Sequence, residues 1–411
     1  MPEWTVRIAE DPAAFERVAA LFGEVEGPAE QASCQRRLRH LRYRPEFTRF
    51  VELDGRVASA ALLRHDRWLI DGVALDAGFV ENVLTHPDYR RRGLFGALLD
   101  DSLRFLSEEG LPLAWLHGSI QRYARFGFAP VRHHAEATLP AEVAAELPLA
   151  GRARPFSAED LADVAALYAA TYCAVPTQEE RTAGIWHWLE PAMTDVTILE
   201  DAGGLVAGYA WVEQRGVRSK LRVVEAAVAP DGRGAQSLLA VLGRRARAAG
   251  LATVYLPLPP DHPLARAAVL AGGEARLTGP VVRGSRWGHA DQAKVLDLGG
   301  ALDALAPALT RRLALSTYAG WQGNIAIDTE RGSASLEINA GAVQAAPRDG
   351  VTQGVLRLPS NGLAPLLVGT YGASEMTTWP GFQAPAPLLA LLDALFPPRW
   401  PTAENEDWWI E

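Results

Sequence analysis

Three consecutive arginines followed by glycine, Arg90 to Gly93, are the most distinctive chemical group in the sequence. They stand directly before a segment in which Phe95, Leu98, Leu99, Leu103 and Leu106 recur at helical spacing. A helix N-terminus offers free N–H groups and the positive end of the helix dipole, so it favours anions. The pattern predicts a site for a phosphate or pyrophosphate group, and a solvated arginine face is the alternative.

Two candidate acid–base residues flank this arginine segment. Glu81 lies in the apolar run that precedes the arginines, and Tyr123 lies in the loop after the next apolar run, 111–117. A tyrosine with an ordinary pKa near about 10 is protonated at neutral pH and can donate a proton. The alternatives are a packed aromatic side chain at Tyr123 and a salt bridge at Glu81. His117 is expected to have a structural role.

The elements around these residues can be read from local signals. Asp11 and Pro12 predict the start of a helix that runs to about residue 22. Asp54-Gly55 and Asp71-Gly72 predict hairpin turns between apolar runs, because both central positions of such turns need positive φ. Residues 79–117 then read as strand, loop, helix and strand.

A second copy of this pattern follows a loose segment at 140–152, which reads as a linker. Strands are predicted near 196–200, 205–213 and 220–229, then a helix at 235–249 and a strand at 251–256. Gly93 and Gly110 are 17 positions apart, and Gly234 and Gly250 are 16 apart. An internal duplication explains this spacing. The second copy has kept only Arg233 of the arginines, so we expect it to be structural.

From Lys294 the sequence pattern differs from that of the two copies. It predicts helices near 299–313 and 387–395 and strands at 323–328 and 333–338. The tail ends in Trp408, Trp409, Ile410 and Glu411, and tryptophans of that size are expected to dock on the protein. The predicted domains are 1–145, 146–290 and 291–411.

The composition and the residue pattern argue against several classes of protein. No apolar run approaches the roughly 18 residues of a membrane span, and the first residues lack a signal core, so a cytoplasmic protein is expected. Cys34 and Cys173 predict buried thiols, and we expect no metal site. A net charge of −9 argues against nucleic acid and suits cationic partners.

With these residues in view, Arg90 to Phe95 resembles the cofactor signature R/Q-x-x-G-x-G/A of the GNAT superfamily of N-acetyltransferases. It departs at the last position, where Phe95 replaces a small residue and Gly96 comes one position late. The wider order of parts resembles the Eis family of bacterial acetyltransferases. Residues 87–93, 116–119 and 123–128 match three motifs of that family in register.

The resemblance implies an α+β fold, with two tandem GNAT-like mixed-sheet domains followed by a sterol-carrier-protein-like α/β domain. It implies acetyl-CoA as co-substrate, Tyr123 as general acid, and homo-oligomers, which are hexamers in this family. The cofactor-binding residues it implies are Val83, Leu84, Thr85, Arg90, Arg91, Arg92, Gly93, Leu94, Phe95, Gly96, Ser119 and Ile120.

The identity of the general base stays open at this stage. In the Eis family the terminal carboxylate follows an aromatic residue and acts as base, whereas here Ile410 and Glu411 extend beyond Trp409. The candidates are the terminal carboxylate of Glu411, its side chain, and Glu81. The predicted function is acetyl transfer to a primary amine of a cationic small molecule, such as an aminoglycoside or polyamine, or of a lysine side chain. A non-catalytic acyl-CoA or lipid-binding protein is the alternative.

Overall fold

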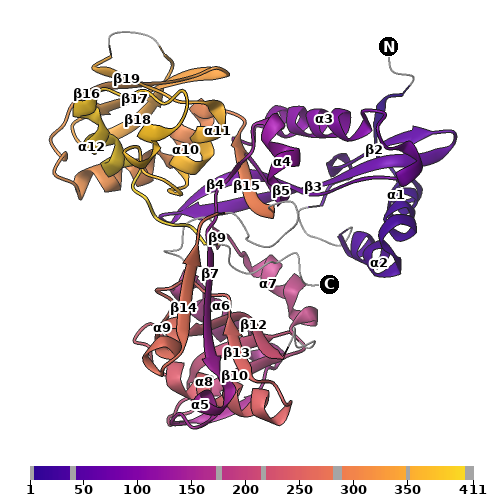
Figure 1. Cartoon of the computed structure of the whole chain (residues 1–411), viewed down its shortest axis with the longest axis vertical. Helices are drawn as coiled ribbons and strands as arrows, with labels where there is room; N and C mark the ends of the chain where they lie inside the picture. Colours follow the sequence, from indigo (N-terminus) through magenta and orange to yellow (C-terminus); the bar gives the residue numbers. More distant parts are fainter. Residues whose placement is uncertain are drawn as a thin grey trace. The chain divides into compact units, whose positions relative to one another are not determined.

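The structure is a computed structural model that describes residues 4–37, 43–172, 178–213, 219–280, 289–348 and 352–402. The chain forms two compact units (Figure 1). One unit contains Met1–Val131 together with Arg283–Trp400, and the other contains Arg132–Val282. The elements that carry the arginine segment belong to the first unit, which therefore decides the geometry of the candidate site.

The first sheet has the strand order β1-β2-β3-β4-β5-β15-β6. Its strands are β1 (Val6–Ile8), β2 (Thr48–Leu53), β3 (Arg56–Ile70), β4 (Val73–Thr85), β5 (Leu113–Ser119), β6 (Ala129–Pro130) and β15 (His289–Val295). The two predicted hairpin turns are confirmed: φ is 51° at Asp54, 75° at Gly55, 51° at Asp71 and 73° at Gly72. The chain leaves β4, forms α3 (Leu94–Glu108) and returns as β5, which pairs with β4 in parallel.

The helices α1 (Pro12–Glu26) and α2 (Pro28–Arg37) precede the meander. The predicted start of α1 is confirmed, since Asp11 is its N-cap and accepts a hydrogen bond from Ala14 N at 2.6 Å. Cys34 of α2 is fully buried, as predicted, and burial raises the pKa of its thiol to about 12. Cys173 lies outside the described residues.

Helices cover both faces of the first sheet. On one face, Val80, Ala114 and Leu116 form a core with residues of α3. On the other, Phe79 and Trp115 form a core with α10 (Leu298–Ala314) and the C-terminal sheet. Because neighbouring residues of a strand point to opposite faces, this division assigns a face to the polar residues nearby.

The second sheet has the order β14-β7-β13-β12-β11-β10-β8. Its strands are β7 (His134–Pro140), β8 (Arg152–Pro155), β10 (Val196–Glu200), β11 (Val206–Val212), β12 (Lys220–Val228), β13 (Thr253–Leu256) and β14 (Glu274–Thr278). The helices of this unit are α5 (Ala141–Ala145), α6 (Leu161–Tyr172), α7 (Ala183–Leu189), α8 (Ala235–Ala248) and α9 (Pro263–Leu270). The predicted linker at 140–152 thus includes a helix. α5 packs closely on α8, because Gly243 leaves room for the backbone of Ala144 and Ala145.

Two strands lie in a different sheet from the one their place in the sequence suggests. β7 pairs with β13 and β14 of the second sheet, although the sequence pattern ends the first domain at 145. β15 pairs with β5 and β6 of the first sheet, across the predicted boundary at 290. The compact units accordingly divide at 131/132 and 282/283. β7 alternates apolar and polar residues, whereas β15, with the sequence HADQAKV, is mostly polar, and neither pattern indicates which strand is the partner.

The two copies share a detailed geometry that supports the predicted duplication. β4 pairs with β5 over Ala77–Phe79 only, and β12 pairs with β13 over Lys220–Arg222 only. Two residues after each paired stretch the strand has a β-bulge, at Glu81 in the first copy and at Val224 in the second. Gly93 and Gly234 cap the following helices with φ of 84° and 86°.

The C-terminal part contains a four-stranded sheet of order β18-β17-β16-β19. Its strands are β16 (Gly323–Thr329), β17 (Gly332–Asn339), β18 (Ala342–Ala346) and β19 (Gly354–Arg357), and its further helices are α11 (Ser360–Leu367) and α12 (Ala386–Leu395). The prediction found β16, β17, α10 and α12 and missed β18 and β19, which are short. None of the helices in the described ranges has the length and apolar character that crossing a bilayer requires.

Candidate active site

A gap between β4 and β5 is the central feature of the candidate site. The parallel ladder between these strands ends at Phe79 and Trp115, and the bulge at Glu81 turns β4 away. Within the described chain, residues 80–85 of β4 have no strand partner on the β5 side. Val83, Leu84 and Thr85 end this stretch, and apart from Thr85 O, which accepts a hydrogen bond from Arg90 Nε, the edge that faces β5 is open to an extended ligand.

The arginine segment lies at the N-terminus of α3, as predicted. Gly93 is the N-cap, and the first intrahelical bond there runs from Ala97 N to Gly93 O at 3.1 Å. The N–H groups of Leu94, Phe95 and Gly96 are therefore available to an anion. The first turn of α3 contains no acidic residue that would compete for them.

The arginines themselves surround this helix end. All three side chains are exposed, and Arg91 has a φ of 65°. Arg90 Nε donates to Thr85 O at 3.3 Å, which ties the segment to the end of β4, and the guanidinium of Arg92 lies 5.3 Å from the centre of the Tyr89 ring. These residues fit a pyrophosphate group, which needs both N–H donors and positive charge.

Tyr123 lies at the end of α4 (Ile120–Tyr123), directly after β5. Its ring is buried between Phe95 of α3, with ring centres 5.7 Å apart, and Phe128, with ring centres 6.1 Å apart. Gly118 makes room for it, since a Cβ there would lie 2.6 Å from Tyr123 Cε2. Burial raises the pKa of Tyr123 above its ordinary value, while the neighbouring Arg122 opposes that change. Tyr123 thus presents a buried phenol close to the first turn of α3.

Ser119 and Ile120 join β5 to α4. Ser119 is buried and is the last residue of β5, and Ile120 is half-buried and begins α4. Both therefore belong to the junction between the strand that borders the gap and the short helix that ends in Tyr123.

Glu81 lies on the face of the sheet away from α3. Its carboxylate Oε1 is 3.1 Å from Arg37 Nε and 3.8 Å from Arg64 Nη1, and its side chain is only 8% exposed. The guanidinium of Arg64 lies 5.0 Å from the ring centre of Phe79, which packs with α10. Glu81 therefore makes ion pairs, the alternative that the sequence left open, and it also borders the gap.

Helix α2 covers this part of β4. Asn82 Nδ2 donates to Glu30 Oε1 at 3.1 Å, and Arg37 Nη1 lies 3.4 Å from the same oxygen. Arg64 also donates to Asp66 at 2.6 and 3.1 Å. In the described part of the chain, this cluster holds two guanidinium groups and three carboxylates.

His117 belongs to the same face as Trp115, two residues earlier on β5. Its Nδ1 is 2.8 Å from Asp291 Oδ1, and its ring centre is 5.9 Å from that of His289. Burial and the charges of His117 and Arg122 lower the pKa of His289. The sequence singled out His117 but not Asp291 or His289, because these lie 174 and 172 positions away and meet it only through the β15–β5 ladder.

The structure thus brings most predicted site residues to one place. The α3 N-terminus and Tyr123 lie on one face of the sheet, Glu81 and His117 lie on the other, and the gap joins the two faces. Glu411 and the tryptophans of the tail lie outside the described residues. No group of three or more His, Cys, Asp and Glu side chains in the described ranges is arranged to hold a metal ion.

Comparison with known proteins agrees with this geometry. Residues 6–131 match the family described as Acetyltransferase (GNAT) domain. This chain carries a GNAT acetyltransferase domain. GNAT domains use acyl-CoA, and the matched range includes the arginine segment, Arg90 to Gly93. The chain is also 31% identical over 187 residues to the mycothiol acetyltransferase of Clavibacter sepedonicus. That match covers 41% of this chain and spans 60% of the length of that relative.

Solved structures share the fold over nearly the whole chain. A protein of unknown function from Enterococcus faecalis V583, described as a probable N-acyltransferase, superposes with a TM-score of 0.75 at 15% identity and covers 98% of both chains. Eis1 from Mycobacterium abscessus has a TM-score of 0.64 at 17% identity and covers 96% of this chain and 97% of its own. These similarities establish a mixed α+β fold with GNAT-like mixed sheets.

Proposed function

We propose that this protein is an acetyl-CoA-dependent N-acetyltransferase acting on a primary amine of a cationic small molecule or of a lysine side chain. The observation that carries the proposal is the gap between β4 and β5. It has a pyrophosphate-type cradle and a buried phenol on one face, and a cluster rich in carboxylates on the other. A thioester lying in the gap would be reached by the amine from one side and by Tyr123 from the other.

The residues of this chain suit the steps of acetyl transfer. The backbone of Val83, Leu84 and Thr85 would align the pantetheine arm and offer an N–H to the thioester oxygen. The amine nitrogen forms a bond to the carbonyl carbon, the carbon–sulfur bond breaks, and Tyr123 protonates the departing thiolate. Burial keeps Tyr123 protonated, because it raises the pKa of the phenol.

Two residues are candidates for the base that removes the proton of the amine. Glu81 borders the gap, and two guanidinium groups balance its charge. The other candidate is Glu411, through its terminal or its side-chain carboxylate, and it lies outside the described residues. The His117–Asp291 pair lies on the same face as Glu81, where it would orient a water molecule or the acceptor.

A direct experiment is to follow thiol release from acetyl-CoA with spermidine, an aminoglycoside and a lysine-containing peptide, and to weigh the products by mass spectrometry. We expect amine-dependent release and a mass gain of one acetyl group. Release that is no faster than hydrolysis without amine, for every acceptor, would reject the proposal.

The same proposal includes a division into three domains, a sterol-carrier-like C-terminal domain, a homohexamer and a cytoplasmic location. Analytical ultracentrifugation tests the hexamer.

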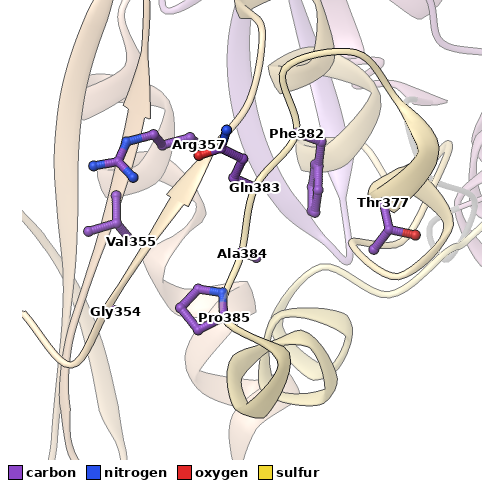
Figure 2. A pocket seen from close by; sticks show the side chains of 8 residues that line it. All are labelled: Gly354, Val355, Arg357, Thr377, Phe382, Gln383, Ala384 and Pro385. Carbon is purple, nitrogen blue, oxygen red and sulfur yellow. The ribbon is translucent and has the colours of Figure 1, made fainter.

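A cavity in the C-terminal part favours a second candidate function, the binding of an apolar ligand. The cavity of about 620 Å³ lies between β19 and residues 382–385 (Figure 2). Val355, Phe382 and Pro385 give it apolar walls, and Arg357 supplies a guanidinium. Arg357 and Gln383 close one side by exchanging backbone hydrogen bonds of 2.7 and 2.8 Å.

This arrangement suits an amphipathic anion such as a fatty acid. A fluorescent fatty acid should bind to the wild type and more weakly to Arg357→Gln, whereas Arg348→Gln, a nearby arginine outside the cavity lining, serves as control. The absence of binding to the wild type would exclude this candidate.

A further inference from the structure

Two further arginines lie next to the first turn of α3, in addition to the arginine segment. Arg122 is in α4, and Arg125 is in the short 3₁₀ helix that follows it, Ala124–Phe126. Both side chains are exposed, whereas Tyr123, which lies between α4 and this 3₁₀ helix, is buried. The segment after β5 therefore turns its phenol toward the core and presents two guanidinium groups to solvent.

Aromatic contacts determine where these two guanidinium groups lie. The Cζ of Arg122 is 5.5 Å from the ring centre of Phe95, the second residue of α3. The Cζ of Arg125 is 4.8 Å from the ring centre of Phe126. The Phe126 ring packs against the first turn of α3, because its Cζ lies 3.9 Å from where a Cβ on Gly96 would be and its centre lies 6.0 Å from that of Phe95. Each guanidinium is thus one aromatic ring away from the helix end that forms the cradle.

The positive charge at this end of α3 is not balanced by acidic side chains. In the described ranges, neither Arg122 nor Arg125 pairs with a carboxylate, and the same is true of residues 90–92. The chain contains 49 acidic and 40 basic residues, so this local excess of positive charge is opposite to the overall balance. Guanidinium groups bind phosphate well, because their planar N–H donors match its oxygens. The excess therefore indicates a ligand with more phosphate than the cradle alone would bind.

Acetyl-CoA has phosphate at two separate places. Its pyrophosphate links the pantetheine arm to the nucleotide, and its ribose carries a 3′-phosphate monoester with about −1.5 to −2 charge at neutral pH. The N–H groups and the arginines of the cradle suit the pyrophosphate. They leave the 3′-phosphate, which is the more distant group from the thioester, without a cation of its own.

Resting on the function proposed above, we propose that Arg122 and Arg125 bind the 3′-phosphate of acetyl-CoA and thereby make the protein select CoA over cofactors that lack this phosphate. The two guanidinium groups donate N–H groups to the phosphate oxygens and compensate their charge. The rings of Phe95 and Phe126 hold the two side chains in place before the cofactor binds, which reduces the entropy lost on binding.

Calorimetric titration with CoA and with 3′-dephospho-CoA tests the proposal without any turnover. The wild type should bind CoA about 10- to 100-fold more tightly, the range for one charge-assisted hydrogen bond. In the double variant Arg122→Gln/Arg125→Gln, the Kd for CoA should rise by that factor and the Kd for dephospho-CoA should stay within about twofold, so the preference disappears. Because both side chains are exposed, the variant should melt at the same temperature as the wild type.

Two single variants are controls for this titration. Arg91→Gln removes an arginine of the cradle, so it should weaken the binding of CoA and of dephospho-CoA by the same factor. Arg104→Gln removes an exposed arginine near the other end of α3 and should change neither. A wild type that binds both ligands equally well, or a double variant that loses affinity for both alike, would overturn the proposal.

Kinetic measurements separate this inference from the proposed function. With acetyl-CoA, the double variant should have a KM raised by about 10- to 100-fold and a kcat within about twofold of the wild type, because the 3′-phosphate takes no part in the reaction. A fall in kcat at saturating acetyl-CoA would place the two arginines in the chemical step and overturn the proposal. If the wild type prefers CoA as expected but acetylates no amine, the proposed function fails and the assignment of Arg122 and Arg125 stands. If it binds neither ligand, both fail.

Discussion

Replacing Tyr123 with phenylalanine tests the proposed mechanism most directly, because it removes one oxygen and leaves the packing intact. The ring is 7% exposed and contacts Phe95, Phe128 and the backbone of Gly118, and a phenylalanine keeps all three contacts. The free energy of unfolding should therefore change by less than about 1 kcal/mol. A loss of activity in this variant would be a loss of chemistry rather than of structure.

General acid catalysis contributes about 10²- to 10⁴-fold, so kcat of Tyr123→Phe should fall by at least about 10²-fold, which corresponds to about 2.7 kcal/mol of activation free energy. Single-turnover measurement of acetyl transfer isolates this step, and calorimetric titration should show acetyl-CoA binding unchanged. Tyr89→Phe is a matched control, since the Tyr89 ring lies under Arg92 in the cradle and has no role in proton transfer.

The pH profile gives an independent readout. The acid form of Tyr123 is required, and burial raises its pKa, so activity should persist above the ordinary tyrosine pKa of about 10 before it declines. This alkaline decline should disappear in Tyr123→Phe. A variant that keeps its rate within about twofold of the wild type, or that keeps the alkaline limb, would refute the role of Tyr123.

Three further changes test other parts of the site. Gly93→Ala places a side chain at a φ of 84°, so it should lower the free energy of unfolding by about 1–2 kcal/mol and raise the KM for acetyl-CoA. The control is Gly110→Ala, at a φ of 76° at the other end of α3, which should lower the free energy of unfolding by the same amount and leave KM unchanged. Equal KM values in the two variants would contradict the cradle. Glu81→Gln weakens a buried pairing with two guanidinium groups, so it should lower the free energy of unfolding, measured by urea denaturation, by about 1–3 kcal/mol. The control is Glu52→Gln, which should lower it by less than about 1 kcal/mol because the partner of Glu52, Arg7, is 59% exposed. Deleting residues 408–411 should abolish transfer with an unchanged melting temperature if the tail supplies the base, and full activity would exclude that role.

Local signals in the sequence were sufficient to predict the parts of the fold and of the candidate site that depend on backbone geometry. The Asp54-Gly55 turn, the Asp11 cap and the glycine at the start of α3 all lie where predicted, because each depends on φ values or hydrogen bonds within a few residues. The duplicated pattern was readable for the same reason, since the spacing between Gly93 and Gly110 follows the length of a helix. The position of the arginine segment at the start of a helix could thus be predicted from residue types and spacing alone.

Contacts between distant segments were decided only by the tertiary structure. The residues of β7 and β15 do not indicate which sheet each strand joins, because the backbone of a strand satisfies its hydrogen bonds equally well in either sheet. That choice brings Asp291 to His117, 174 positions away in sequence. The ion pairs of Glu81 with Arg37 and Arg64 arise in the same way, from α2 lying over the bulge of β4. The sequence alone determined which residues could do the chemistry, and long-range packing determined which charges surround them.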